Sequence, residues 1–466
     1  MSPTGSGVAS GSTRCTVNRP RAVHRAGSGE YNPLISNLPF RRNQPAPATE
    51  PVADGPARAV VERRVGETEF VLLMALISAL TALAIDMLLP GFSGMREAFG
   101  LAPDATDLAA TITLFFIGNG IGNLVYGPMA DAWGRKPVLV ASLGLYGGAA
   151  LAATLAPNLT VLLAARFVWG VGAGGPRVLT QAIVRDRFSG DAMARVMSMI
   201  QAAFFIGPIA APLLGAGLVA IGSWRWVMAF GVLSALTTAI WSLRLQETLP
   251  PSRRRQFTPR AITGGVRAVL GHRTTLLFSL SLMFLSGAFF SFLSSSELIF
   301  DDVFGHGDWF VTYFSLMAVL LGCMSLGINR LLRRVSAGRI TLAAGAGMIV
   351  FSAARVVLAQ LTDGVPPFWV WVVLFSLSNV CVVAMFPSLN SLALEPMGDL
   401  AGTAASVVGF LTSVGGAVLA TITDRRLGGT VAPLALGYLL YSVISYCCQL
   451  TALRRSATPV ESIIPG

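Results

Sequence analysis

Charged residues are scarce in this sequence. Only 12% of its 466 residues are Asp, Glu, Lys or Arg, whereas soluble globular chains carry about 25%. A soluble protein of this length would lack the polar surface that it needs. At 53% hydrophobic residues, most of the chain is also too apolar to be intrinsically disordered. The composition therefore predicts an all-α polytopic membrane protein.

Cysteine and histidine are also few. The chain has five Cys and three His, contains no C-x-x-C pair, and separates the three His widely along the sequence. These absences exclude a disulfide framework, a zinc site of the usual spacing and a Cys–His or Ser–His catalytic group. We therefore expect a protein that is not an enzyme and that holds no metal and no cofactor.

Long apolar runs take up most of the chain. Twelve of them, each near the roughly 20 residues that cross a bilayer core, alternate with short polar breaks. Helices are the only form, apart from a closed barrel, that satisfies the backbone in lipid. The predicted spans are residues 70–89, 108–126, 137–156, 161–183, 196–221, 226–245, 276–299, 310–331, 340–361, 368–389, 405–422 and 431–453.

The longest connection within this apolar region, residues 246–275, divides the spans into two groups of six. It predicts two six-helix halves, residues 66–245 and 276–455, with a substrate site between them, as in duplicated transporters. Residues 1–65 are rich in Pro, Gly, Ser and Arg, and we expect a disordered cytoplasmic tail. Residues 456–466 are expected to form a second cytoplasmic tail.

The basic residues predict the orientation of the spans. Of the 34 basic residues all but Lys136 are Arg, and most of those between spans fall in alternate loops. The positive-inside rule places these loops and both termini in the cytoplasm, although Arg425 and Arg426 fall in an outer loop. Five Trp at the predicted outer ends are expected to form an aromatic belt: Trp224, Trp226, Trp309, Trp369 and Trp371.

A polar motif follows the second span. It contains Gly127, Asp131, Gly134, Arg135 and Lys136 within ten residues. The first glycine permits close approach of a neighbouring helix, and the second permits a tight turn. The aspartate can cap a helix end or pair with the arginine. We expect these residues to act as a cytoplasmic latch between helices.

The same string resembles the G-x-x-x-D-x-x-G-R-K signature of the major facilitator superfamily. The signature lysine is the only lysine in the chain. The resemblance covers about residues 66–455. It implies twelve transmembrane helices in two pseudo-symmetric halves and transport by alternating access.

Two cations lie in the fourth span. Arg166 and Arg177 are eleven residues apart, so they lie within roughly 20° of one helix face, which Gly170 and Gly174 share. An ionisable residue inside a span is costly and points to function. The stretch around Arg166 resembles the family's L-x-x-x-R-x-x-Q-G motif, with Trp169 in place of Gln. We expect Arg166 to assist proton coupling, with snorkelling or a structural ion pair as the alternatives, and Arg177 to line the substrate pathway.

The fifth span carries Gly207, Pro208, Pro212 and Gly215. Proline removes backbone donors and kinks a helix, and small residues allow close packing of a neighbour. The stretch is similar to the family's antiporter motif, which favours export over import. A kinked helix that says nothing about direction is the alternative.

The first span ends at Asp86, in the string Ile85-Asp86-Met87-Leu88-Leu89-Pro90. A carboxylate in an apolar span could bind and release a proton as access alternates. The string resembles drug/proton antiporters of the bicyclomycin and chloramphenicol resistance group, which implies a proton-coupling role for Asp86. A capping carboxylate at the outer end of the span is the alternative.

Weaker signals extend the predicted substrate pathway into the second half. Glu297, at the outer end of the seventh span, could hydrogen-bond a substrate. Phe205, Phe290 and Phe410 could line an apolar pocket, although core packing is the usual role of such rings. Arg355 in the ninth span is expected to snorkel toward the membrane surface.

These features predict a monomeric, proton-coupled exporter of small, mostly apolar compounds in the bacterial inner membrane. Its partners would be the substrate, protons and the lipid bilayer, and the proton gradient would drive it. A proton-linked importer or exporter of a metabolite, such as a sugar, an organic acid or an amino-acid derivative, stays open on the same fold. The Arg residues are spread between apolar segments, which argues against a nucleic-acid-binding surface.

Overall fold

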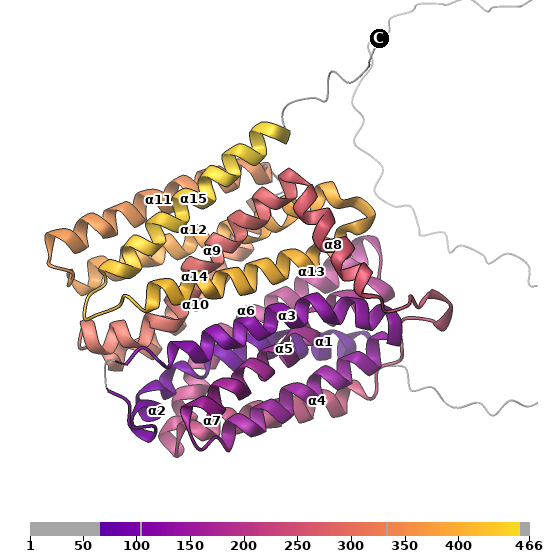
Figure 1. Ribbon diagram of the computed structural model, residues 1–466, viewed down its shortest axis with the longest axis horizontal. Helices are drawn as coiled ribbons and strands as arrows, with labels where there is room; N and C mark the ends of the chain where they lie inside the picture. The colour runs from indigo at the N-terminus through magenta and orange to yellow at the C-terminus, as the bar shows by residue number, and fades with distance from the viewer. Residues whose placement is uncertain (1–65, 103–104, 332–333, 457–466) are drawn as a thin grey trace, which may run out of the picture. The chain divides into compact units, whose positions relative to one another are not determined.

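A computed structural model describes residues 66–102, 105–331 and 334–456, and every regular element among them is helical (Figure 1). The prediction for residues 1–65 and nearly all of that for residues 456–466 lie outside the described residues.

The first half begins with α1 (Glu67–Asp86), which leads through the 3₁₀ turn η1 (Leu89–Gly91) into the short helix α2 (Phe92–Ala98). Five long helices follow: α3 (Ala109–Trp133), α4 (Arg135–Thr154), α5 (Leu159–Arg187), α6 (Gly190–Ile221) and α7 (Trp224–Ser242). A 3₁₀ turn, η2 (Pro251–Arg253), and helix α8 (Pro259–Gly271) connect the halves.

The second half begins with α9 (Arg273–Leu298), which ends in the π-helical turn η3 (Ile299–Val303). The remaining elements are α10 (Gly307–Leu331), α11 (Ala337–Leu361), α12 (Phe368–Leu394), η4 (Glu395–Leu400), α13 (Ala401–Phe410), the π-helical turn η5 (Leu411–Gly415), α14 (Gly416–Asp424) and α15 (Ala432–Ser456).

Each predicted span coincides with a helix, or, for the eleventh, with α13 and α14 together. Within the described residues, nine helical stretches are long and apolar enough to cross a membrane. Two others contain shorter apolar segments, Ala210–Ile221 in α6 and Trp309–Ser325 in α10. Helix α6 continues as one helix across Pro208 and Pro212.

Two elements differ from the predicted layout. The central connection contains α8, whose Val269 is fully buried in a cluster with Ala404 and Val407 of α13. The eleventh span is divided by η5, where a side chain on Gly415 would overlap the Met283 side chain of α9. In both places a tertiary contact shapes the backbone, and such contacts leave no periodic signal in the sequence.

Three of the five Trp residues predicted to form an aromatic belt are exposed, as a belt requires. Trp226, Trp309 and Trp369 are 56%, 50% and 61% exposed. The prediction is wrong for the other two. Trp224 is buried against Phe99, and Trp371 is buried in a stack with Phe375.

Helix α3 packs against α5 with almost no side chain between the two backbones. A Cβ atom on Gly170 would overlap the carbonyl oxygen of Phe115, and one on Gly118 would overlap that of Phe167. One turn further along α3, a Cβ on Gly122 would lie 2.5 Å from the carbonyl oxygen of Val171 in α5. Glycine is therefore required along this face, as expected where close packing holds membrane helices together.

Another face of α3 meets the second half, which Figure 1 draws in orange and yellow beside the indigo and magenta first half. A Cβ on Gly120 would lie 2.6 Å from Val414 in η5. The hydroxyl oxygens of Thr113 and Thr421 are 3.2 Å apart. The rings of Phe116 and Phe290 stack with their centroids 3.6 Å apart. Helix α3 therefore lies at the contact between the halves.

We predict that Gly170→Ala destabilises the protein by about 1–3 kcal/mol or more, because the new methyl group meets backbone that no side-chain rotation can relieve. The matched control is Gly148→Ala in α4, where nothing lies within 4 Å of the added atom. This control should be neutral or stabilised by up to about 1 kcal/mol. Thermal unfolding of the two detergent-purified variants measures the difference, and equal melting temperatures would contradict the packing argument.

Candidate functional site

The polar motif forms a tight turn between α3 and α4. Gly134 has a φ of 103°, and a Cβ atom there would overlap the Glu247 carboxylate, so only glycine fits. Across this turn an Arg135 guanidinium nitrogen lies 2.6 Å from Asp131 Oδ1. We call this end of the helix bundle the motif end, and the opposite end the far end.

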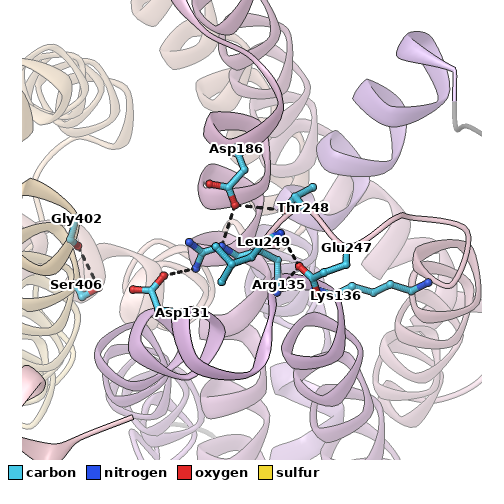
Figure 2. A network of polar contacts seen from close by, with 9 residues as sticks. All are labelled: Asp131, Arg135, Lys136, Asp186, Glu247, Thr248, Leu249, Gly402 and Ser406. Atoms are coloured by element: carbon cyan, nitrogen blue, oxygen red, sulfur yellow. Dashed lines mark hydrogen bonds and ion pairs between the residues drawn. The ribbon is translucent and has the colours of Figure 1, made fainter. Parts of the chain in front are cut away.

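Arg135 also binds the end of α5. Its Nε donates to Asp186 Oδ2 at 3.0 Å, and the hydroxyl of Thr248 donates to the same oxygen at 3.2 Å. Figure 2 shows the Arg135 side chain between the Asp131 and Asp186 carboxylates. One buried guanidinium thus joins α3, α4 and α5.

Glu247 caps the first turn of α4 from the segment that follows α7. Its two carboxylate oxygens accept hydrogen bonds from the backbone N–H groups of Arg135 at 2.9 Å and Lys136 at 3.2 Å. A carboxylate is favourable at this position because the N-terminal N–H groups of a helix carry partial positive charge. The ammonium group of Lys136 donates in turn to the carbonyl of Leu243 at 2.7 Å.

The motif end also meets the second half through Gly127. A Cβ on this residue would lie 3.2 Å from the Ser406 hydroxyl of α13. Figure 2 shows Ser406 and Gly402 on the helix that faces the cluster of Asp131, Arg135 and Asp186. The backbone N–H of Arg255 donates to the carbonyl of Asp131 at 2.9 Å, so the central connection binds the cluster as well.

Asp86 is the last residue of α1 and is only 5% exposed. No hydrogen bond or ion pair joins its carboxylate to any other described residue. Helix α6 packs directly beside it. A Cβ on Gly215 would overlap the carbonyl of Met87, and one on Gly207 would lie 3.2 Å from Ala82. Two glycines of the predicted antiporter motif therefore bring α6 close to the segment that holds Asp86.

Arg166 is fully buried, and carbonyl oxygens and aromatic rings surround it instead of carboxylates. Its guanidinium donates to the carbonyls of Ala84 at 3.0 Å and Thr111 at 3.3 Å. The same group lies 4.6 Å from the Phe115 ring centre and 5.0 Å from that of Trp169. Trp169, which replaces the family's Gln, thus holds the cation by its ring face.

Arg166 lies close to the Asp86 segment without pairing with it. Its acceptor Ala84 is two residues before Asp86, yet no ion pair between the two side chains occurs in the described structure. The structural ion pair left open as an alternative is therefore not formed here. Among the described residues no ion pair joins Arg177 to Asp86; its side chain is exposed, and its place in the substrate pathway stays a prediction.

The predicted substrate-pathway residues are only partly brought together. Phe290 is buried in its stack with Phe116, and Phe410 is half-buried at the end of α13. The side chains of Phe205 and Pro208 lie outside the described residues. Pro212 is buried. Glu297 is held by an ion pair with Arg96 at 2.6 Å, in which both side chains are buried.

Arg355 is another buried guanidinium, so the snorkelling prediction is wrong. It is 1% exposed, and its guanidinium carbon lies 4.8 Å from the Phe375 ring centre and 4.4 Å from that of Tyr438. These rings come from α12 and α15. Three helices of the second half therefore meet around Arg355, as three helices of the first half meet around Arg166.

Sequence reasoning missed three polar residues. Asp186 lies between two arginines at the end of α5, a pattern that looks topogenic. Arg96 looks like an ordinary outer-loop charge until the fold places it against Glu297. Asp424 is 3% exposed, and one of its carboxylate oxygens lies 2.5 Å from the Ser294 hydroxyl. Only the Asp186 pattern, an acid within a basic stretch, offered a signal.

Comparisons with known proteins agree with this architecture. The family model of the Major Facilitator Superfamily matches residues 74–420. The bicyclomycin resistance protein homolog of Haemophilus influenzae is 27% identical, over 81% of this chain and 95% of its own. Multidrug resistance protein D of Escherichia coli is 26% identical, over 84% and 98%.

A solved structure shares the fold. The Escherichia coli xylose transporter XylE, in a partially occluded inward-open conformation, aligns with a TM-score of 0.64 over 85% of this chain and 100% of its own, at 13% identity. The prediction of twelve transmembrane helices in two pseudo-symmetric halves is thereby confirmed. Because the family model covers well over half of the sequence, this chain belongs to the major facilitator superfamily, a family of multi-pass membrane transporters of small molecules.

Proposed function

We propose that the protein exports small, mostly apolar compounds across the bacterial inner membrane in exchange for protons, as a monomer. The names of two relatives support this class of substrate, since one is a bicyclomycin resistance homolog and the other a multidrug resistance protein. Both termini and the central connection lie in the cytoplasm in this proposal, because the arginines gather in those loops.

The observation that carries the proposal is the placement of Asp86. Among the described residues only three carboxylates are buried, and Asp86 is the one in the first half. It is the last residue of a transmembrane helix, α1, which α6 contacts through two glycines. A carboxylate without a partner in this setting is costly when ionised, so taking up a proton stabilises it there.

Arg166 supports this role by holding α1. Because its guanidinium binds the carbonyl of Ala84, a shift of α5 relative to α1 changes the surroundings of Asp86. The protonation of Asp86 and the packing of the first half are coupled in this way. We assign Asp86 as the proton-binding group and Arg166 as the residue that positions its helix.

Alternating access requires that each end of the bundle can open. At the motif end, Gly127 packs against Ser406 of α13, and the Asp131–Arg135–Asp186 cluster holds α3, α4 and α5 together in the first half. At the far end, Arg96 and Glu297 join the two halves by an ion pair. Opening the motif end separates Gly127 from α13, and opening the far end breaks the Arg96–Glu297 ion pair, so the free energies of these contacts set the balance between the two states.

A drug-susceptibility panel tests the proposal. Cells that express the protein should tolerate higher concentrations of some apolar antibiotics than cells with an empty vector, and an uncoupler should remove the difference. Everted vesicles with an imposed pH gradient then give the direction of transport. If the vesicles accumulate a compound only under a pH gradient opposite to the one that export requires, the protein is an importer.

Asp86→Asn should abolish proton-driven export while leaving substrate binding in place, because the amide keeps the shape of the carboxylate and cannot carry the proton. For exchange of one proton against a neutral molecule, each 100 mV contributes about 2.3 kcal/mol, or roughly a 50-fold concentration ratio. The variant should lose this dependence in vesicles. Wild-type, uncoupler-sensitive export by the variant would place the proton site elsewhere.

Asp131→Asn should slow transport by up to about fivefold, since a partly exposed ion pair contributes about 0.2–1 kcal/mol. The Asp131 side chain is 43% exposed, so a larger loss is not expected. Asp107→Asn, which is exposed in the turn just before the opposite end of α3, is the control. Equal amounts of both variants in the membrane, with unchanged transport in each, would remove the latch role.

The proposed orientation predicts which side labels reach. A cysteine placed at exposed Arg254 in the central connection should react with a membrane-impermeant maleimide only in everted vesicles. A cysteine at exposed Glu97 should react in intact spheroplasts. Labelling in the reverse pattern would invert the topology and with it the direction of export.

A further inference from the structure

The far end contains a small buried pocket that mixes charges of both signs. Its lining includes Arg96 of α2, Ser294, Ser295 and Glu297 of α9, and Asp424 of α14. Arg96 belongs to the first half and the other four residues to the second. The pocket therefore forms only when the two halves meet at this end.

The pocket holds two carboxylates and one cation. The Arg96 guanidinium pairs with Glu297 at 2.6 Å. Asp424 is 3% exposed, has no ion pair within the described residues, and has one oxygen, Oδ1, without a hydrogen-bond partner there. Asp424 is thus a buried carboxyl group whose charge nothing nearby neutralises, and an ionised group in that position is strongly disfavoured.

The hydroxyl of Ser294 gives an independent argument. Its oxygen lies 2.5 Å from Asp424 Oδ2, 2.8 Å from the carbonyl of Phe290 and 3.2 Å from that of Ser291. A serine hydroxyl has a single hydrogen. When that hydrogen goes to the Phe290 carbonyl, the contact with Asp424 needs a hydrogen supplied by the aspartate. A protonated Asp424 that donates to Ser294 satisfies both contacts.

Other ionisable groups around the pocket do not change this balance. Asp301 and Asp302 act on Glu297 and add negative charge. The Tyr441 hydroxyl of α15 is hydrogen-bonded to the hydroxyl of Thr423, the neighbour of Asp424. Arg425 and Arg426 follow Asp424, but their side chains are exposed.

We propose that Asp424 is a proton-binding site that couples protonation to closure of the far end. With the far end closed, Asp424 is buried and carries a proton. Opening separates Arg96 from Glu297 and admits water, which stabilises the ionised form of Asp424. A proton taken up from the far side therefore favours closure, which is the step that an exporter needs after it releases its substrate. This proposal rests on the proposed proton-coupled function and adds a second proton site in the other half.

Spin-label distances across the far end test the coupling. In a background without native cysteines, labels at exposed Glu97 and Val365 report the separation of the halves. Raising the pH should shift the wild-type distances toward the open state. Asp424→Asn, which keeps the shape of the protonated acid, should hold the far end closed at every pH. Asp107→Asn, an exposed carboxylate at the same end, should behave as wild type.

Ser294→Ala removes the hydroxyl that hydrogen-bonds Asp424 and so tests the proton site without this partner. This variant keeps the Asp424 carboxyl group, so closure should still respond to pH, with a shifted midpoint. A wild-type pH response in Asp424→Asn, or loss of the response in Ser294→Ala alone, would overturn the proposal.

Infrared spectroscopy detects the proton directly and does not depend on how Asp424→Asn folds. The Asp86→Asn variant removes the other buried aspartate of the described structure. In that variant, with ¹³C-labelled aspartate, a protonated carboxyl band should be present near neutral pH and disappear at alkaline pH. Absence of the band while the far end is closed would overturn the proposal. Neither measurement uses a substrate or a gradient, so a failed susceptibility panel would not affect their outcome.

Discussion

Close backbone packing of α3 on two faces is the constraint on which the rest of the structure depends. Gly118 and Gly122 bring it against α5, and Gly120 and Gly127 bring it against the second half. Lipid is as apolar as the helix surfaces, so the hydrophobic effect does not drive helices together in a membrane. Van der Waals packing between closely approaching helices does so instead. The same helix is therefore firmly held in its own half and placed where the halves must separate.

The buried charges follow from this packing. Arg166 and Arg355 each lie where three helices meet, and each is held by aromatic faces. Asp86 and Asp424, which form no ion pair with any described residue, lie buried at helix ends. In the described part of the chain, each half thus buries a cation among aromatic rings and an unpaired carboxylate at a helix end.

The two ends of the bundle are built on different polar contacts. The motif end relies on a network of partly exposed carboxylates around Arg135, with Glu247 as a helix cap. Among the described residues, the far end has one buried ion pair between the halves and an aspartate that pairs with no cation. Exposed pairs are weak and screened, while buried groups respond strongly to protonation. In the proposed mechanism, the far end is therefore the more sensitive of the two to pH.

The sequence by itself determined the membrane class, the number of spans, the two halves and the polar motif, because hydropathy and turn chemistry are local properties of the chain. It also marked Asp86 and Arg166, since an ionisable residue in an apolar run stands out. Only the tertiary structure decided that Arg166 binds carbonyls instead of Asp86, that Arg355 is buried, and that Arg96 pairs with Glu297. The burial of Asp424 was likewise decided only by the tertiary structure, because its surroundings come from helices far apart in the sequence. Burial and pairing across such distances leave no periodic trace along the chain.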